Sequence, residues 1–179
     1  MVERLFVTNK KNRAGVYGVK LYIMGKPWVI TVDDEVLFAN KMNPQFVYTG
    51  MARGRAMWAS IIEKAWAKAH GNYLNMFGDN VHNSLHYLTG VPVFSYNLRN
   101  NTNRTEAKVA HDRIAAGNYY DYVMTATTEP TENNTHLNAC GLRQNHAYSI
   151  VEAFNMTDRN NLLYRMILLR DPRGQSSYN

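Results

Sequence analysis

Two residues near the C-terminal end of the chain, His146 and Asp171, have the types and the spacing of a hydrogen-bonded catalytic pair. His146 opens one apolar run and Asp171 follows another, and the polar segment 155–161 between the runs indicates a β-hairpin. Counting outward from a turn centred between residues 158 and 159 brings His146 opposite Asp171. We therefore predict that the two side chains meet at the open end of this hairpin.

Such a pair would carry out the proton transfers of a nucleophilic hydrolase. A carboxylate that accepts a hydrogen bond from a histidine fixes its tautomer and orientation, and the histidine can then take a proton from a serine or cysteine nucleophile. The same spacing also fits a surface histidine that faces a surface aspartate across an ordinary hairpin. The residues alone leave both interpretations open.

The rest of the chain supplies elements that could position this pair. Residues 16–23 and 28–32 are predicted strands that a turn at 24–27 joins into a hairpin. Residues 57–70 predict an amphipathic helix that ends at Gly71. Its apolar face, which we interpret as core packing, consists of Trp58, Ile61, Ile62, Ala65, Trp66 and Ala69.

A second helix and a further strand are expected before the C-terminal hairpin. Thr105 predicts the N-cap of a helix that runs to Gly117, and residues 119–127 predict a strand. The tyrosines in the segment 119–122 could stack on nucleic-acid bases, but they fit an ordinary strand better. The chain contains no nucleic-acid-binding motif, so we interpret its net charge of +6 as a solvated basic surface.

The residues around the pair form motifs that resemble those of a known family. Residues 141–149, Gly-Leu-x-x-x-His-Ala-Tyr-Ser, resemble the histidine motif G-L-V-x-G-H-A-Y-S of calpain-type cysteine proteases, and residues 169–174 are similar to their asparagine motif R-N-P-W-G. Residues 29–34 and 58–71 are similar to the family's V-x-V-D-D and W-x-x-L-L-E-K-A-Y-A-K-x-x-G, and Leu88-Thr89-Gly90 falls at its L/F-T-G-G. These motifs occur in the family's order.

The resemblance implies an α+β fold of the papain-like, calpain protease-core type. Residues 1–87 would be the helix-containing C-terminal part of the first lobe, and residues 88–179 would be the antiparallel, β-rich second lobe that carries the histidine and asparagine positions. The active site would lie in the cleft between the lobes, with His146 as general base and Asp171 as its orienting residue.

The chain also departs from the family pattern. The family's nucleophile lies in a Q-x-x-x-x-D-C-W-type segment, which does not occur in this sequence. The single cysteine, Cys140, has no motif match and is interpreted as a small structural thiol. Asp171 replaces the family's asparagine, and Arg173 replaces the tryptophan that shields the pair from water. The resemblance therefore implies a partial protease core that is inactive alone.

No cofactor is predicted for this chain. Calcium is the family's ligand, but Ala56 stands where the family has an acidic calcium ligand, and alanine provides no side-chain oxygen. The acidic run 33–35 is interpreted as a strand end or a hydrogen-bonding element rather than a metal site. His82 and His86 have helical ligand spacing for zinc but lack the glutamate of a zincin motif.

Composition agrees with a globular protein. Hydrophobic residues make up 45% and charged residues 19% of the 179 positions. A single cysteine argues against a disulfide scaffold and for a cytoplasmic location, and no apolar run reaches the length of a membrane span. The expected partners are a protein or peptide substrate, the missing cysteine-bearing lobe or a larger assembly, with no specific nucleic acid.

Two functions from different classes remain. The first is part of a calpain-like cysteine endopeptidase, which the preserved histidine motif favours. The second is a degenerate calpain-like domain that acts as a binding or scaffold module, for example on a cytoskeletal assembly. The loss of the acidic residue at Ala56 and the Asp-Pro-Arg-Gly variant at 171–174 favour the second.

Overall fold

The computed structural model describes residues 2–8, 10–37, 57–76, 80–98, 104–129 and 141–172. The chain divides into two compact units, Met1–Phe94 and Ser95–Asn179. This division falls later in the chain than the predicted boundary between residues 87 and 88. The assignment of the two units to the two lobes of a protease core stays a prediction.

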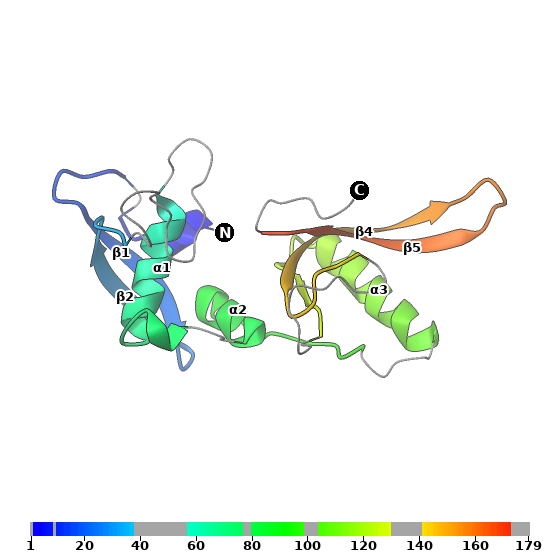
Figure 1. The fold of residues 1–179 in the computed structure, drawn as a ribbon, viewed down its shortest axis with the longest axis horizontal. Helices are drawn as coiled ribbons and strands as arrows, with labels where there is room; N and C mark the ends of the chain where they lie inside the picture. Colours follow the sequence, from blue (N-terminus) through cyan, green and yellow to red (C-terminus); the bar gives the residue numbers. More distant parts are fainter. Residues whose placement is uncertain are drawn as a thin grey trace. The chain divides into compact units, whose positions relative to one another are not determined.

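Unit 1 is built on an antiparallel hairpin covered by a helix (Figure 1). Strands β1 (Val16–Ile23) and β2 (Lys26–Asp33) pair along their whole length, as the sequence predicts. Met24 and Gly25 form the two-residue turn, both with positive φ, at 52° and 75°. A turn of this kind matches the right-handed twist of the flanking strands, which explains why the pairing has no register shift.

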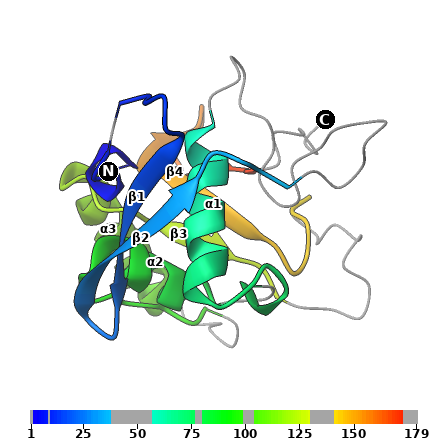
Figure 2. The same cartoon turned by 90° about the vertical axis from the view of Figure 1, so that its left-hand side faces the viewer.

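The core of unit 1 lies between this hairpin and helix α1 (Trp58–Ala69), which crosses it in Figure 2. The helix is confirmed within a residue at each end, and Ile61, Ala65 and Trp66 of its predicted apolar face are buried. Trp58 is an exception, because its side chain in the first turn is 47% exposed. The buried cluster consists of Leu5, Val19, Leu21, Val32, Ile61, Ala65 and Trp66.

Three shorter helices are also present among the described residues of unit 1. The 3₁₀ turns η1 (Val2–Leu5) and η2 (Leu74–Met76) flank the hairpin and α1 in sequence. Helix α2 (Val81–Thr89), which sequence analysis did not predict, packs against β1. The side chain of Asn80 caps its first turn, and Gly90 ends it in the left-handed conformation at φ 71°. These are ordinary helix-end signals, so α2 was detectable in the sequence.

The described residues of unit 2 form one helix against a three-stranded antiparallel sheet of order β3-β4-β5. Helix α3 (Arg104–Tyr119) lies along β4 (Ala147–Thr157), which pairs with β3 (Thr125–Thr127) and β5 (Leu163–Arg170) (Figure 1). Together the two units give the predicted α+β class. No helix in the described ranges has both the length and the hydrophobicity needed to cross a membrane.

Three local predictions in unit 2 are wrong. Thr105 lies inside α3 rather than capping it, and Gly117 also lies inside the helix, which continues to Tyr119. The predicted strand 119–127 shrinks to Thr125–Thr127, because residues 120 and 121 form a turn in which Asp121 has a φ of 55°. The tyrosines of this segment are exposed at the end of a helix instead of alternating along a strand.

The C-terminal hairpin is present, but its register differs from the prediction. Ser149 pairs with Arg170, and the register shifts between Ile150 and Glu152, which leaves an extra residue in β4. The turn follows Thr157 and is organised by Asp158, whose carboxylate accepts hydrogen bonds from the backbone of Leu162 and Asn160. The bond from Leu162 is the main cause that lowers the pKa of Asp158 below its ordinary value.

Candidate active site

His146 and Asp171 flank the hairpin of unit 2, one residue before β4 and one residue after β5. Continuing the observed register places Asp171 opposite Tyr148 rather than opposite His146. The predicted pairing of backbones is therefore wrong, and the histidine and aspartate are diagonal neighbours. Because the error is an even number of residues, both side chains still project from the same face of the sheet.

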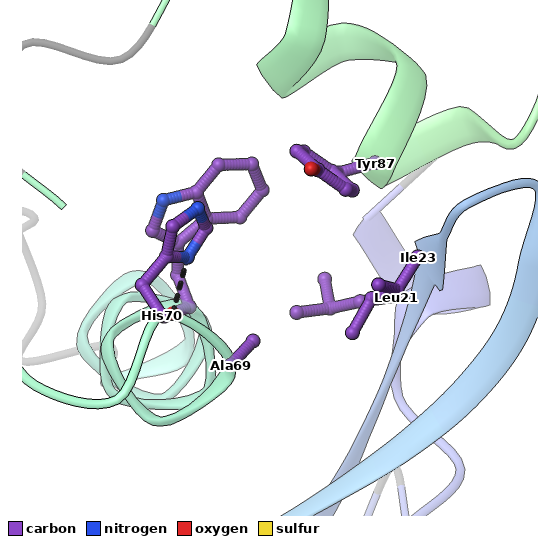
Figure 3. A pocket seen from close by; sticks show the side chains of 6 residues that line it. Leu21, Ile23, Ala69, His70 and Tyr87 are labelled. Carbon is purple, nitrogen blue, oxygen red and sulfur yellow. Dashed lines mark hydrogen bonds between the residues drawn. The ribbon is translucent and has the colours of Figure 1, made fainter. Parts of the chain in front are cut away.

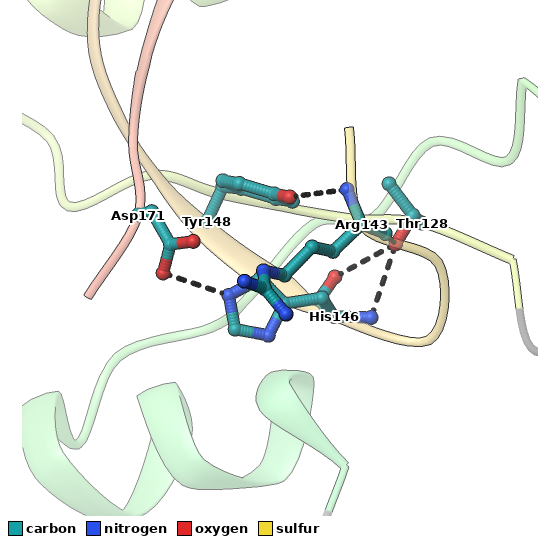
Figure 4. A network of polar contacts seen from close by, with 5 residues as sticks. All are labelled: Thr128, Arg143, His146, Tyr148 and Asp171. Atoms are coloured by element: carbon teal, nitrogen blue, oxygen red, sulfur yellow. Dashed lines mark hydrogen bonds and ion pairs between the residues drawn. The ribbon is translucent and has the colours of Figure 1, made fainter. Parts of the chain in front are cut away.

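The side chains meet as predicted. Nε2 of His146 lies 2.9 Å from Oδ1 of Asp171, and the two side chains are only 11% and 12% exposed (Figure 4). A carboxylate can only accept a hydrogen bond, so in the neutral imidazole Nε2 carries the proton and Nδ1 has the free lone pair. The pair thus defines which nitrogen could act as a base.

Two residues that sequence analysis did not assign to the site surround His146. The hydroxyl of Thr128 accepts a hydrogen bond from the amide of His146 at 3.0 Å. The ring of Tyr148 meets the imidazole edge to face, with centroids 4.8 Å apart at 88°. A contact between Tyr148 and His146 could have been predicted from the sequence, since Tyr148 follows His146 by two residues in the motif. Thr128 comes from a distant strand end, and nothing in the local pattern indicated it.

The residue before His146 has an unusual backbone. Asn145 has a φ of 49°, and its amide donates to the carbonyl of Glu129 at 2.8 Å. Asparagine adopts this left-handed conformation more readily than most residues, although less readily than glycine. The histidine motif that this segment resembles has glycine at the same place, so the structure gives a physical reason for that glycine.

Other candidate residues do not join this pair. Asp33 accepts hydrogen bonds from Lys64 and from the amide of Glu35, so the acidic run is a hydrogen-bonding element of unit 1. Nδ1 of His86 lies 3.0 Å from the carbonyl of Val91, beyond the end of α2. The described ranges contain no group of three or more metal-binding side chains. Ala56, Cys140 and Arg173 lie outside the described residues.

Unit 1 contains a small cavity of about 100 Å³. Its walls are aromatic and aliphatic, and Figure 3 shows His70 and Tyr87 on opposite sides. Nδ1 of His70 donates to the carbonyl of Trp66 at 2.9 Å, which leaves the ring stacked on Trp66. The cavity has no acid–base pair. It is lined by Leu21, Ile23, Trp66, Ala69, His70 and Tyr87.

Comparison with known proteins agrees with the motifs. Residues 1–179 match the family model described as calpain family cysteine protease. The chain belongs to the calpain family. It is 26% identical over 179 residues to the calpain-type cysteine protease DEK1 of Zea mays, which covers 96% of this chain and 8% of that protein. It is 28% identical to calpain-8 and 30% identical to calpain-12 of Mus musculus, covering 93% and 90% of this chain.

The chain spans only a minor part of these relatives. It covers 23% of calpain-8 and 21% of calpain-12. Membership therefore identifies the family and agrees with the α+β fold, and the activity of a whole calpain is a matter for proposal.

Proposed function

We propose that this chain is the histidine-bearing part of a calpain-type cysteine endopeptidase core. The observation that carries the proposal is the largely buried hydrogen bond between Nε2 of His146 and Oδ1 of Asp171. With Nε2 held by the carboxylate, Nδ1 is the nitrogen available for proton transfer. The substrate class is a peptide bond, and the nucleophile is a cysteine thiol that another stretch of polypeptide supplies.

In this role His146 would act twice. As a base, Nδ1 takes the proton of the thiol, and the thiolate attacks the scissile carbonyl. As an acid, the imidazolium returns that proton to the leaving amine, after which a water molecule cleaves the acyl-enzyme with His146 again as base. Asp171 stabilises the imidazolium between these steps and keeps the ring oriented.

The substitution of aspartate for the family's asparagine is compatible with this chemistry. Both side chains accept the hydrogen bond from Nε2, but only the carboxylate adds a negative charge that favours the protonated imidazole. Replacing Asp171 with asparagine should therefore preserve the acceptor for Nε2 and the geometry of the site.

The test compares the 179-residue chain with an extended protein in which a Q-x-x-x-x-D-C-W-type cysteine segment is fused to its N-terminus. The 179-residue chain should not cleave unstructured casein, because its sequence has no such segment. The extended protein should cleave casein and should lose that activity on His146→Ala. Cleavage by the 179-residue chain that disappears on Cys140→Ala would contradict the proposal, as would an extended protein that is indifferent to His146→Ala.

A second candidate function is a non-catalytic binding module, and two sequence observations favour it. Ala56 replaces an acidic residue of the family, and Arg173 replaces the tryptophan that shields the histidine pair. Under this proposal the partner is a protein of a large assembly such as the cytoskeleton. An extended protein that has the cysteine segment but does not cleave casein under any calcium concentration would favour this second function.

A further inference from the structure

The loop that carries His146 is tied to the end of β3 by hydrogen bonds. The amide of Thr128 donates to the carbonyl of His146 at 2.9 Å, and the amide of His146 donates back to the hydroxyl of Thr128 at 3.0 Å. One residue farther out, the amide of Asn145 donates to the carbonyl of Glu129 at 2.8 Å. Both backbone polar groups of His146 are therefore bonded to the same residue.

The hydroxyl of Thr128 makes a further bond within this loop. It has one proton, and the carbonyl oxygens of Arg143 and His146 lie 2.7 Å and 3.2 Å from it. The shorter distance indicates that the hydroxyl donates to the carbonyl of Arg143. The carbonyl of His146 already accepts a hydrogen bond from the amide of Thr128. The hydroxyl therefore joins residue 143 to residue 146 across a turn that includes the left-handed Asn145.

Tyr148 holds the same loop from its other side. Its hydroxyl accepts a hydrogen bond from the amide of Arg143 at 2.8 Å, and its ring forms the edge-to-face contact with the imidazole of His146. The side chain of Tyr148 is buried, at 4% exposure, so its ring is itself held by packing. A buried ring that contacts the imidazole limits the side-chain rotation of His146.

We propose that Thr128 and Tyr148 are positioning residues that hold His146 so that Nε2 meets Asp171. Thr128 fixes the backbone of the histidine, and Tyr148 limits the rotation of its ring. Both residues act through His146 and not on the substrate. The inference rests on the proposed function, since it explains how the base of that site is oriented. In this proposal the ring of His146 is oriented by the loop before β4 and by the end of β3, and not by Asp171 alone.

The test measures the histidine ring in the 179-residue chain by NMR. The ¹⁵N chemical shift of Nε2 reports the hydrogen bond to the side chain at position 171, so Asp171→Asn should change it. In a Thr128→Val background the change on Asp171→Asn should shrink by at least about twofold, because the ring is no longer held against its partner. Thr128→Ser keeps the hydroxyl and should preserve the full change.

Controls separate positioning from general destabilisation. Thr127→Val alters the exposed last residue of β3, next to Thr128, and should leave the response of Nε2 to Asp171→Asn intact. Tyr148→Phe keeps the ring and should also preserve most of the response, whereas Tyr148→Leu should reduce it. If Thr128→Val does not fold, the Tyr148→Leu and Tyr148→Phe pair decides the question.

Equal responses of Nε2 in the wild-type, Thr128→Val and Tyr148→Leu backgrounds would overturn the inference. This measurement needs no peptidase activity, so it is independent of the proposed function. An extended protein that ignores His146→Ala would refute the protease role and leave the positioning result unchanged. Unchanged ring responses combined with activity that depends on His146 would refute the positioning role alone.

Discussion

The two units differ in the apolar side chains that they bury, although unit 1 also buries Ser60 and Glu63 and unit 2 buries His111. Unit 1 buries a cluster of aliphatic and aromatic residues in which Val19 and Leu21 are fully enclosed. Among the described residues of unit 2, the buried hydrophobic side chains are Ala110, Tyr148 and Ala153. Tyr148 is also part of the polar network that holds His146. Unit 1 thus has the larger apolar cluster, and unit 2 has the hydrogen-bond network that orients a titratable side chain.

This difference has an energetic consequence. Apolar burial tolerates small errors in position, because it depends on area rather than direction. A polar interior is stabilising only when each donor and acceptor finds its partner at the right distance. Loss of one apolar side chain should therefore cost unit 1 more free energy than loss of one polar contact costs unit 2, although the polar contact controls the geometry of the site.

The largest expected effect is the loss of an enclosed side chain in unit 1. Leu21 is 1% exposed, and Leu21→Ala should lower the free energy of unfolding of unit 1 by about 2–5 kcal/mol through lost burial and the remaining cavity. All three tryptophans, Trp28, Trp58 and Trp66, lie in unit 1, so their fluorescence during urea unfolding follows this unit. Leu74→Ala, at an 82% exposed position of the same unit, is the matched control. A loss no greater than that of the control would contradict the apolar-core account.

The second effect concerns close packing around a glycine of unit 1. Gly90 has a φ of 71°, and a Cβ there would lie 2.5 Å from an atom of the Tyr22 ring. Gly25 has a similar φ of 75°, but a Cβ there would meet nothing within 4 Å. Gly25→Ala should cost about 1–2 kcal/mol for the left-handed backbone alone. Gly90→Ala should cost more, and the difference in urea midpoint isolates the clash. Equal midpoints would show that Tyr22 moves aside freely.

The third effect tests the polar interior of unit 2. Asp171→Ala leaves a largely buried imidazole without its carboxylate, which should lower the free energy of unfolding by about 1–3 kcal/mol. Asp171→Asn keeps an acceptor for Nε2 and should cost less. Near-ultraviolet circular dichroism of the tyrosines in unit 2 would follow both variants. Wild-type stability in Asp171→Ala would mean that the pair contributes nothing to this interior.

Local sequence patterns predicted the hairpin and the first long helix well, but they predicted the end of α3 poorly. The β1–β2 hairpin and α1 follow from alternation, a glycine turn and a helical apolar face, and the structure confirms them. The predicted end of α3 is wrong, because Gly117 was interpreted as the residue that ends the helix. A Cβ at that position would lie 2.8 Å from the sulfur of Met124, so the glycine serves close packing instead. Local propensity cannot reveal a contact of this kind.

The candidate pair also combines features that have a local sequence signal with features that depend on tertiary contacts. His146 and Asp171 were found from residue type and hairpin spacing, and their side chains do meet. The register was not predictable, because the extra residue between Ile150 and Glu152 has no turn or glycine signal. Thr128 was missed since its role depends on the approach of β3 to the loop before β4. Sequence thus indicated the chemistry, while the contacts that orient it depend on tertiary structure.

The smallest expected effect is electrostatic and lies on the surface of unit 1. The hydrogen bond from Lys64 is the main cause that lowers the pKa of Asp33 below its ordinary value of 3.8, with the amide of Glu35 as the second. A group whose pKa is lower in the folded state stabilises the fold above its unfolded pKa, and this contribution disappears as the pH falls through the folded pKa. The contribution should be small, because Asp33 is exposed to solvent.

Lys64→Met removes this contact and keeps most of the aliphatic side chain. At pH 6 the variant should have a slightly lower thermal midpoint than the wild type, as measured by tryptophan fluorescence. The difference between the two proteins should shrink below pH 3.8, where Asp33 becomes protonated first in the unfolded chain and then in the folded one. A difference that stays constant from pH 6 to pH 2.5 would mean that Lys64 stabilises unit 1 without the charge of Asp33, through packing or through its hydrogen bond to the carbonyl of Glu35. In that case the lowered pKa of Asp33 would have no measurable effect on stability, and the electrostatic contribution at this surface would be absent.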